Sequence, residues 1–557
     1  MKLTFLGAAH EVTGSRFLLE ACGKNIMVDY GMEQGVDLFE NAPLPIAESQ
    51  IDLVLLTHAP IDHSGYLPLL YKNGFRGRIY ATKATTDLCK IMLLDSAHIQ
   101  ESDAEWKNRK AERSGKPLVE PLYTQEHAMK TCELFAPCDY EQEIDLCDGV
   151  RIRFVDVGHL LGSASIEVNV SEGGESKTLV FSGDIGNVNQ PLLRNPKYMT
   201  KADFVVMEST YGDRSHGPVP DYIASLTEIL QATLDRGGNV VIPSFAVGRT
   251  QEMLYFIRQI KQEGRVKGHD GFPVYVDSPL AIEATNVFNE NTAECADEET
   301  LKLIRAGVNP ITFDGLRIAT SADESKLINE NAEPKVIISA SGMCDAGRVR
   351  HHLKHNLWKP ECTVLFVGYQ SNGTLGRSLV DGVKEVRLFD ETIEVKATIK
   401  TLAGVSGHAD NAGLMRWASS FDPKPQHVFV VHGEDEVSMT FAARLRDELG
   451  MDAQAPYNGE SWELAPLRLV AEGNKTRLTK PDRELAAQDV LPKRRAPVPS
   501  QVEPRKQDVS SEDYAQLALS AQRLLSLVDG MRSRARKEQR KLTNQINILL
   551  KRFGKRK

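Results

Sequence analysis

The chain has 557 residues, of which 41% are hydrophobic and 26% charged, and its formal net charge is −9. This length predicts two or three domains with ample buried core, and the negative charge argues against binding of nucleic acid by bulk electrostatic attraction. The eight cysteines are scattered without C-x-x-C spacing and indicate neither a zinc ribbon nor a disulfide framework. No apolar stretch is long enough to cross a bilayer, so we expect a soluble, cytoplasmic protein with no membrane partner.

The first candidate metal ligands crowd one turn after the apolar run 51–56. The segment reads Thr57-His58-Ala59-Pro60-Ile61-Asp62-His63. Imidazole nitrogens and carboxylate oxygens suit Zn²⁺ or a similar divalent ion, and ligands on a tight loop after a rigid strand lose little entropy on binding. A His pair at a strand end also occurs simply to cap the strand or to pack. Taken alone, this segment leaves both interpretations open.

Three later strand ends carry a further residue of ligand type beside glycine. His159, Asp184 and His432 each follow an apolar run that is typical of a short strand. Four such sets in one chain are hard to ascribe to chance. Together they favour a metal site built from distant parts of the chain.

These residues resemble the metallo-β-lactamase superfamily, whose signature is H-x-H-x-D-H followed by a lone His, a bridging Asp and a final His. Three segments are similar to motifs A, B and C of its β-CASP branch, which includes ribonuclease J and the mRNA 3′-end cleavage nuclease. They are Glu208-Ser209-Thr210-Tyr211-Gly212, Ser406-Gly407-His408-Ala409-Asp410 and Val431-His432-Gly433-Glu434. The resemblance runs from about Leu3 to about Leu469.

The resemblance implies an α/β fold: a four-layer αββα metallo-β-lactamase sandwich with an inserted α/β β-CASP cap domain. We therefore divide the chain into five segments. They are 1–211, the first part of the metallo-β-lactamase domain; 212–394, the β-CASP domain; 395–479, the closing part of the metallo-β-lactamase domain; 480–510, a flexible linker; and 511–557, a basic helical extension.

Two metal sites are implied, one of them incomplete. The ligands would be His58, His159 and Asp184 in site one, and Asp62, His63, Asp184 and His432 in site two. Where the family signature has its second His, this chain has Pro60, which has no side-chain donor atom. Site one keeps three protein ligands, as in many catalytic zinc centres with an open water position, so we expect weaker binding there rather than failure. Both sites suit zinc, and Mn²⁺ fits the same ligand types.

His10, in the glycine-flanked turn 7–14, is a speculative replacement for the missing ligand, because that turn should lie at the same end of the sheet. A histidine at the surface, or one that hydrogen-bonds behind a ligand, is the favoured interpretation.

The resemblance also implies catalytic roles. Asp62 would hold or deprotonate the attacking water, and His408 paired with Glu208 would donate a proton to the leaving oxygen. Asp29, after the predicted strand 25–28, resembles a carboxylate that orients a ligand imidazole. The structural alternatives are an ordinary turn residue for Asp29 and a buried, satisfied His–Glu hydrogen bond for the pair.

The segment from Gly212 to about Glu394 contains three glycine-rich loops that follow apolar runs, at 243–252, 339–343 and 368–377. A strand, a loop and a helix start form a geometry that receives phosphate, although such loops also serve as plain α/β connections. Together they are similar to the family's cap domain, which grips the substrate backbone. The candidate phosphate or RNA contacts are Arg249, Thr250, Ser341, Arg348 and Arg377.

The last part of the chain lies beyond the resemblance. Its linker is rich in proline and charge and should be flexible. The extension has apolar residues at alternating four- and three-residue steps and ends in a run of basic residues against the single acid Glu538. Three interpretations stay open: a coiled coil that pairs two chains into a homodimer, an RNA-binding arm, and a helix folded back on its own body.

The predicted function is that of a metal-dependent ribonuclease that hydrolyses phosphodiester bonds, with single-stranded RNA as partner. Glu208, His408 and the cap have no use in a lactamase or thioester hydrolase. The alternatives are a catalytically impaired RNA-binding protein, for which Pro60 is the direct evidence, and a hydrolase of a small molecule. The nuclease ranks first because every other chemical position holds a competent residue. Internal or terminal cleavage, and RNA or DNA, are not decided by the sequence.

Overall fold

The computed structural model describes residues 1–34, 39, 42–115, 117–217, 221–370, 373–402 and 406–478. The linker predicted for 480–510 and the basic helix predicted for 511–557 lie outside the described residues. Within the described part of the chain, no helix combines the length and the apolar character that crossing a bilayer requires.

The first sheet is built from both ends of the described chain. Its strand order is β23-β22-β1-β2-β3-β4-β5-β6. The strands are β1 (Lys2–Gly7), β2 (Arg16–Ala21), β3 (Lys24–Val28), β4 (Leu53–Leu55), β5 (Arg78–Thr82), β6 (Phe135–Cys138), β22 (Ser461–Leu464) and β23 (Leu467–Ala471). From β3 to β6 the neighbours are parallel. The carboxyl ends of β3 and β4, which precede Asp29 and His58, therefore lie at one edge of this sheet.

The second sheet has the strand order β21-β20-β11-β10-β9-β8-β7. Its strands are β7 (Ile144–Cys147), β8 (Val150–Asp156), β9 (Ala164–Glu172), β10 (Glu175–Phe181), β11 (Phe204–Glu208), β20 (His427–Val431) and β21 (Ala453–Gln454). Strands β10, β11 and β20 are parallel neighbours, and β8 and β10 are both antiparallel to β9. Because β8, β10, β11 and β20 point the same way, their carboxyl ends also share one edge.

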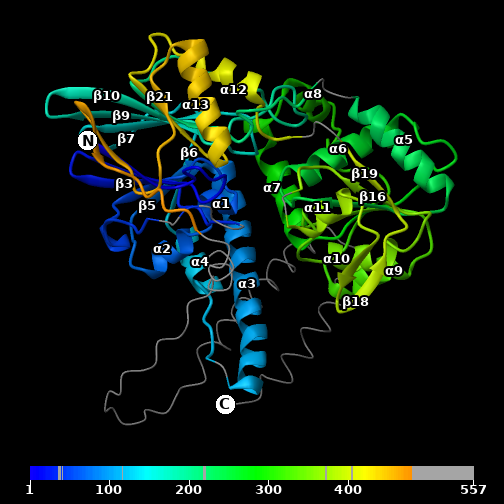
Figure 1. Ribbon diagram of the computed structural model, residues 1–557. Coiled ribbons are helices and arrows are strands. Elements are labelled where there is room, and N and C mark those ends of the chain that lie inside the picture. Colours follow the sequence, from blue (N-terminus) through cyan, green and yellow to red (C-terminus); the bar gives the residue numbers. More distant parts are fainter. Residues whose placement is uncertain are drawn as a thin grey trace, which may run out of the picture. The chain divides into compact units, whose positions relative to one another are not determined.

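The two sheets face each other across an apolar core and carry helices on their outer faces. In that core the ring centroids of Phe5 lie 5.9 Å from Phe17 and 4.9 Å from Phe429. Helices α1 to α4 pack on the first sheet, and α12 and α13 pack on the second (Figure 1). The helices are α1 (Ile61–Ser64), α2 (Leu67–Lys72), α3 (Lys83–Ser114), α4 (Gln125–Cys132), α12 (Asn411–Ala418) and α13 (Asp435–Leu449), and a 3-10 turn spans Glu48–Gln50. This is the αββα sandwich that the resemblance implied.

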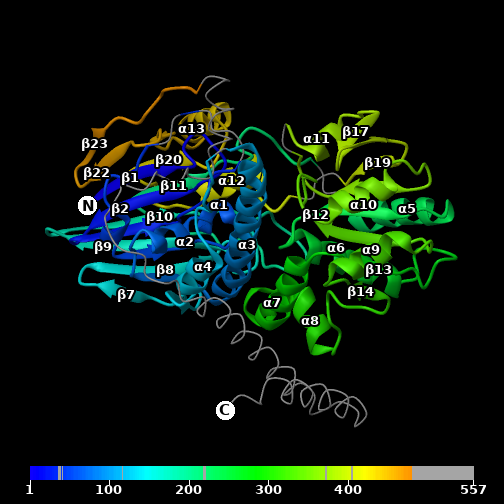
Figure 2. The same ribbon diagram turned by 90° about the horizontal axis from the view of Figure 1, so that it is seen from below.

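The inserted domain has its own sheet, in the order β14-β13-β15-β12-β16-β19, with parallel neighbours throughout. Its strands are β12 (Val240–Ser244), β13 (Val274–Val276), β14 (Leu316–Ile318), β15 (Val336–Ala340), β16 (Thr363–Phe366) and β19 (Thr398–Thr401), beside a hairpin of β17 (Glu385–Leu388) and β18 (Glu391–Glu394). Its helices are α5 (Tyr222–Asp235), α6 (Arg249–Gln262), α7 (Pro279–Cys295), α8 (Glu298–Arg305), α9 (Ala322–Glu330), α10 (Val349–Asn356) and α11 (Leu375–Val380). Figure 2 shows strands β12 to β14 among α6, α9 and α10. All loops that follow these parallel strands open at one edge.

Hydrogen bonds at the end of α7 hold the cap domain to the sandwich. Arg194 donates from Nε to Ala296 O at 3.1 Å and from Nη2 to Ala293 O at 3.3 Å. Asn291 on α7 donates to Asp87 on α3 at 3.3 Å. These contacts fix the cap beside the sheet edge that carries the predicted ligands.

The layer between the second sheet and its helices is filled by Trp417, which is fully buried and meets Phe421 edge-on at 5.2 Å. We expect Trp417→Ala to lower the free energy of unfolding of the sandwich by about 3–5 kcal/mol, because it leaves a large cavity. Thermal unfolding followed by circular dichroism measures this. Trp358→Ala is the control, since Trp358 is 52% exposed and should change stability by less than about 0.5 kcal/mol. Equal melting points for the two variants would contradict this packing.

Candidate metal centre and catalytic site

All six predicted metal ligands gather where the strand ends of the two sandwich sheets meet. The loops after β4, β8, β10 and β20, together with α1, carry them. Their donor atoms form two groups, one of His58, His159 and Asp184 and one of Asp62, His63 and His432, and the atoms of each group lie within 4.8 Å of one another. The structure therefore brings together residues that are hundreds of positions apart in the chain.

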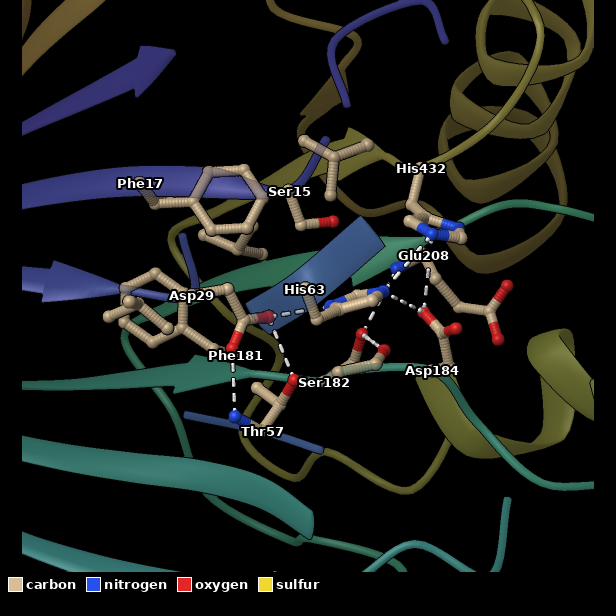
Figure 3. Close-up of a pocket in the computed structure, with 14 residues that line it drawn as sticks. Ser15, Phe17, Asp29, Thr57, His63, Phe181, Ser182, Asp184, Glu208 and His432 are labelled. Carbon is tan, nitrogen blue, oxygen red and sulfur yellow. Dashed lines mark hydrogen bonds and ion pairs between the residues drawn. The ribbon is translucent and has the colours of Figure 1, made fainter. Parts of the chain in front are cut away.

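Asp184 lies between the two groups. Its Oδ2 is 3.2 Å from His58 Nε2 and 3.7 Å from His159 Nε2. Its Oδ1 is 3.4 Å from His63 Nε2 and 3.6 Å from His432 Nε2. Figure 3 shows the His63 ring pointing toward Asp184 and His432. Because each oxygen faces a different group, the carboxylate has the geometry of a bridge between two cations.

Asp62 completes the second group. Its Oδ2 is 3.7 Å from His432 Nε2 and 4.0 Å from His63 Nε2. The two imidazole nitrogens are themselves only 3.3 Å apart. Asp62 is the most exposed of these side chains, at 21%, so it borders the solvent side of the centre.

Asp29 orients two of the imidazoles. Its Oδ2 accepts hydrogen bonds from His63 Nδ1 at 2.7 Å and from Thr57 Oγ1 at 2.8 Å, and its Oδ1 accepts from Thr57 N at 2.8 Å (Figure 3). The hydroxyl of Thr57 has one proton, and it donates that proton to Asp29. The same hydroxyl oxygen therefore accepts a hydrogen bond from His58 Nδ1 at 3.0 Å. Both rings therefore carry their proton on Nδ1 and turn Nε2 toward Asp184.

Thr210 fixes the orientation of the His432 ring, as Thr57 does for His58. Its hydroxyl donates to His432 O at 3.2 Å and accepts from His432 Nδ1 at 2.9 Å. Sequence reasoning missed Thr57 and Thr210, although each lies inside a motif it quoted. The only sequence signal for them is position: Thr57 directly precedes His58, and Thr210 lies two residues after Glu208.

The residues present fit a divalent metal. His58 Nε2 and Asp184 Oδ1 are buried, and neither has a hydrogen-bond partner among the described residues. Leaving such polar atoms unsatisfied is costly, and a bound cation satisfies them. The backbone also departs from its usual conformations here, with φ of 56° at Asp29 and 50° at His432. Strain of this kind is typical of functional sites whose surroundings hold them in place.

Burial and neighbouring charges put most of these groups in forms that bind metal. Burial opposes ionisation of Asp62, but His432 and His63 outweigh it and lower its pKa to about 2. The same histidines hold the pKa of Asp184 well below its usual value against the effect of burial. Burial lowers the pKa of His58, and of His159 still further. At neutral pH these are carboxylates and neutral imidazoles, the forms that coordinate cations.

The predicted acid pair lies against the same carboxylate. Glu208 is buried, and its Oε1 accepts from Ile185 N at 2.6 Å and from His408 Nδ1 at 3.2 Å. His408 Nδ1 is also 4.0 Å from Asp184 Oδ2, and its side chain is 21% exposed. Burial opposes protonation of His408, but the carboxylates of Glu208, Asp184 and Asp62 outweigh it and raise its pKa to about 9. The partner is thus a buried, satisfied carboxylate, whereas the histidine is protonated at neutral pH and partly open to solvent.

Pro60 occupies the place of the family's second histidine as the first turn of α1 begins. Its carbonyl accepts from His63 N and Ser64 N, each at 2.9 Å. Proline has no backbone amide donor, and a helix start does not need one. Pro60 is therefore well suited to begin the short helix that carries Asp62 and His63. It contributes structure to site two and no ligand to site one.

His10 does not replace the missing ligand. The turn lies at the expected place, because Ala8 O accepts from His432 N at 2.7 Å. The imidazole itself bonds Asp435 Oδ1 at 2.8 Å and Ala455 O at 3.2 Å and stacks on Tyr457 at 3.7 Å. With both nitrogens engaged away from the centre, the speculative interpretation was wrong.

The five predicted phosphate contacts lie in the loops and first helical turns that follow strands at one edge of the cap sheet, but several of them make contacts inside the protein. Thr250 is buried and donates to Phe245 O at 2.7 Å. Arg348 donates to Asp277 Oδ1 at 2.7 Å and to Thr320 O at 2.7 Å.

Of the others, Arg249 pairs with Glu252 and is largely buried. Arg377 pairs with Asp381 at 2.7 Å but is 38% exposed, and Ser341 is partly exposed. Of the five, only Arg377 and Ser341 are therefore available to a phosphate in solvent without first giving up a contact inside the protein.

The αββα sandwich, the inserted α/β domain and two donor groups joined by one aspartate define a metallo-hydrolase with a capped metal centre. Three family models match the chain: the metallo-beta-lactamase superfamily domain over residues 18–195, the Beta-Casp domain over 250–379, and the Zn-dependent metallo-hydrolase RNA specificity domain over 392–456. The chain belongs to the β-CASP family of the metallo-β-lactamase superfamily.

Curated relatives extend over most of the chain. Ribonuclease TTHA0252 of Thermus thermophilus is 36% identical over 78% of this chain and 94% of its own length. Transcription termination factor FttA of Methanosarcina mazei is 30% identical over 83% of this chain and 72% of its own length. Among solved structures, a protein of unknown function from Enterococcus faecalis V583 aligns over 84% of this chain and 99% of its own at 13% identity, with a TM-score of 0.48.

The role of Asp29 can be tested without any substrate. We expect Asp29→Ala to weaken metal binding roughly 10- to 100-fold, because His63 loses its fixed tautomer and Thr57 its acceptor. Competition with a chromophoric chelator measures the affinity, with circular dichroism as a check on folding. Asp52→Ala is the control, since Asp52 bonds Lys24 and Asn25 and touches none of the ligands. A folded Asp29→Ala protein with unchanged metal affinity would show that the carboxylate is only a turn residue.

Proposed function

We propose that this protein is a metal-dependent ribonuclease that hydrolyses RNA phosphodiester bonds with an activated water. The observation that carries the proposal is the shared carboxylate of Asp184, which faces two donor groups and lies 4.0 Å from His408. The printed names of the relatives, one of them a ribonuclease at 36% identity, support the choice of RNA. The proposal assigns the sandwich to 1–211 and to the part of 395–479 that follows β19. The cap is 212–394 together with β19, because the boundary expected at 394/395 falls before a strand that pairs with β16 in the cap sheet.

Zinc is the proposed metal, with Mn²⁺ as the alternative that the ligand types allow. Divalent ions bound at the two groups would supply an activated water and stabilise the charge that develops on the phosphoryl oxygens. The second group, with Asp62, His63, His432 and Asp184, offers four side chains, whereas the first offers three. We therefore expect unequal affinities, with the weaker ion beside Pro60.

The protein's own groups divide the proton transfers. A carboxylate with a pKa of about 2 is a weak base, so Asp62 orients the water through a hydrogen bond rather than keeping its proton. The proton that the water loses would pass to solvent, which Asp62 borders with 21% of its side chain exposed. His408 is protonated at neutral pH and donates to the leaving oxygen. Glu208 holds the His408 ring by accepting from Nδ1, which leaves Nε2 to face the substrate.

The proposed substrate is single-stranded RNA, and the proposed location is the cytoplasm, in line with eight cysteines that are all free thiols. Pairing of two chains through 511–557 is proposed from the sequence pattern alone, because that segment lies outside the described residues.

The acid role predicts a specific kinetic loss. We expect His408→Ala to lower kcat roughly 10²- to 10⁴-fold while metal content, measured by mass spectrometry of the dialysed protein, stays unchanged. The wild-type rate should fall as pH rises through about 9, because His408 then loses its proton, and this alkaline limb should be missing in the variant. His269→Ala, which removes an exposed His–Asp pair in the cap, is the control. Equal loss of metal and activity would refute the assignment.

Replacing Pro60 tests the second candidate function, that of a catalytically impaired RNA-binding protein, against that of an active enzyme. We expect the wild-type protein to bind two ions of unequal affinity, and Pro60→His to tighten the weaker one while changing the rate of RNA cleavage only a few-fold. Calorimetric titration with Zn²⁺ measures both affinities. His159→Ala should abolish the weaker binding event and His432→Ala should weaken the tighter one. A wild-type protein that cleaves nothing and gains activity through Pro60→His would instead be the impaired member.

A further inference from the structure

Two large aromatic side chains are about half exposed at the edge of the cap sheet that borders the metal centre. Phe245 follows β12 directly and is 49% exposed, and Tyr369 follows β16 and is 50% exposed. Strands β12 and β16 are parallel neighbours, so both rings lie at the same edge. Ligands of parallel α/β sheets bind at this edge. Aromatic side chains are normally among the most buried residues, so half-exposed rings at this position need a reason.

One face of the Phe245 ring lies against the backbone of Gly342. A Cβ built on Gly342 would lie 3.2, 3.2 and 3.3 Å from its Cδ2, Cε2 and Cζ atoms. Nearly equal distances to three consecutive ring atoms place Gly342 over the face of the ring and not at its edge. The absence of a side chain at Gly342 thus lets the ring lie flat on backbone, and about half of Phe245 stays exposed to solvent.

The loop that carries Phe245 also reaches the loop that carries His159. A Cβ built on Gly248 would come within 2.6 Å of Leu160 Cδ2, and Leu160 follows the ligand His159. Phe245 is therefore three residues from a direct contact between the cap and a metal-ligand loop.

Tyr369 is fixed relative to the same glycine. Gln370 is buried and donates to Gly342 O at 3.1 Å and to Tyr369 O at 3.1 Å, which ties the loop after β16 to the support of Phe245. The ring of Tyr211 lies 6.1 Å from that of His408. Burial raises the pKa of Tyr211, and the phenol of Tyr369 adds to this rise.

We propose that Phe245 and Tyr369 are stacking platforms for unpaired bases of the RNA next to the scissile phosphate. An open aromatic face on a rigid backbone is what a base stacks on, whereas bases within a duplex are stacked on one another and unavailable. Stacking of this kind tolerates any base, so the two rings select single strands without selecting sequence. The inference rests on the proposed function and specifies the form of RNA that the site accepts.

The experiment uses the full-length, metal-loaded protein with leucine and aromatic replacements. For Phe245→Leu and Tyr369→Leu we expect KM for a labelled single-stranded RNA to rise roughly ten- to hundred-fold with little change in kcat. Phe245→Tyr and Tyr369→Phe should keep KM within about three-fold of wild type, since a stacking face remains. Phe389→Leu, which removes a 40% exposed ring elsewhere in the cap, is the matched control and should leave KM unchanged.

A substrate with an abasic nucleotide at each position in turn identifies the stacked bases. At the position that faces a given ring, the wild-type and leucine proteins should handle the abasic RNA equally, because the interaction is already lost from the substrate. Leucine variants with wild-type KM, or with the same penalty on every abasic RNA, would overturn the proposal.

Binding separates this inference from the proposed function. Dissociation constants for the same RNAs are measured with His408→Ala protein, alone and combined with each leucine replacement. If the wild-type protein cleaves no RNA but the leucine replacements still weaken single-strand binding, the nuclease proposal fails and the stacking platforms stand. If RNA is cleaved but neither leucine replacement changes the dissociation constant or KM, the nuclease proposal stands and the stacking platforms fail.

Discussion

The buried carboxylate of Asp184 is the constraint on which the rest of the site depends. It is 5% exposed, and its two oxygens face four imidazoles at 3.2 to 3.7 Å. An ionised carboxylate in such a place is tolerable only if positive charge compensates it. In the protein without metal that compensation comes in part from His63, whose pKa is raised well above its usual value because Asp184 and Asp29 outweigh the effect of burial. Divalent cations compensate the same charge when they bind.

The fold is arranged so that both sheets serve this carboxylate. Strands β8, β10, β11 and β20 deliver His159, Asp184, Glu208 and His432 to one edge because they run in the same direction. Strands β3 and β4 of the other sheet deliver Asp29 and His58. The cap then adds loops from one edge of a third sheet, and the contact between Gly248 and Leu160 joins them to the metal centre. In the proposed mechanism, the chemistry and the substrate contacts are thus divided between two domains that meet at strand ends.

The six predicted ligands lie close together in the structure, and each has a local signal in the sequence. His159, Asp184 and His432 lie beside glycine after an apolar strand, and His58, Asp62 and His63 crowd one turn after another such strand. The αββα sandwich and the cap, implied by the ordered motifs, are confirmed by the structure and by the family matches. Other features have no local signal. Nothing near His10 shows that it bonds Asp435, which is 425 positions away.

The cap loops illustrate the same limit. Arg348 was chosen as a phosphate contact because it follows a glycine-rich loop, but it bonds Asp277, which is 71 positions away. The sequence does not mark Phe245 or Tyr369, since an aromatic residue after a strand is ordinarily part of a core; their exposure of 49% and 50% is known only from the structure. Long-range pairing decided each of these cases. The most direct test of the account is the metal stoichiometry of the wild-type protein and of Asp184→Asn, with Asp156→Asn, a second buried aspartate of the same sheet, as control. If Asp184 bridges two cations, the wild-type and control chains bind two zinc ions each and Asp184→Asn loses at least one. A wild-type chain that binds no ion, or an Asp184→Asn chain that keeps both, would show that Asp184 is not such a bridge.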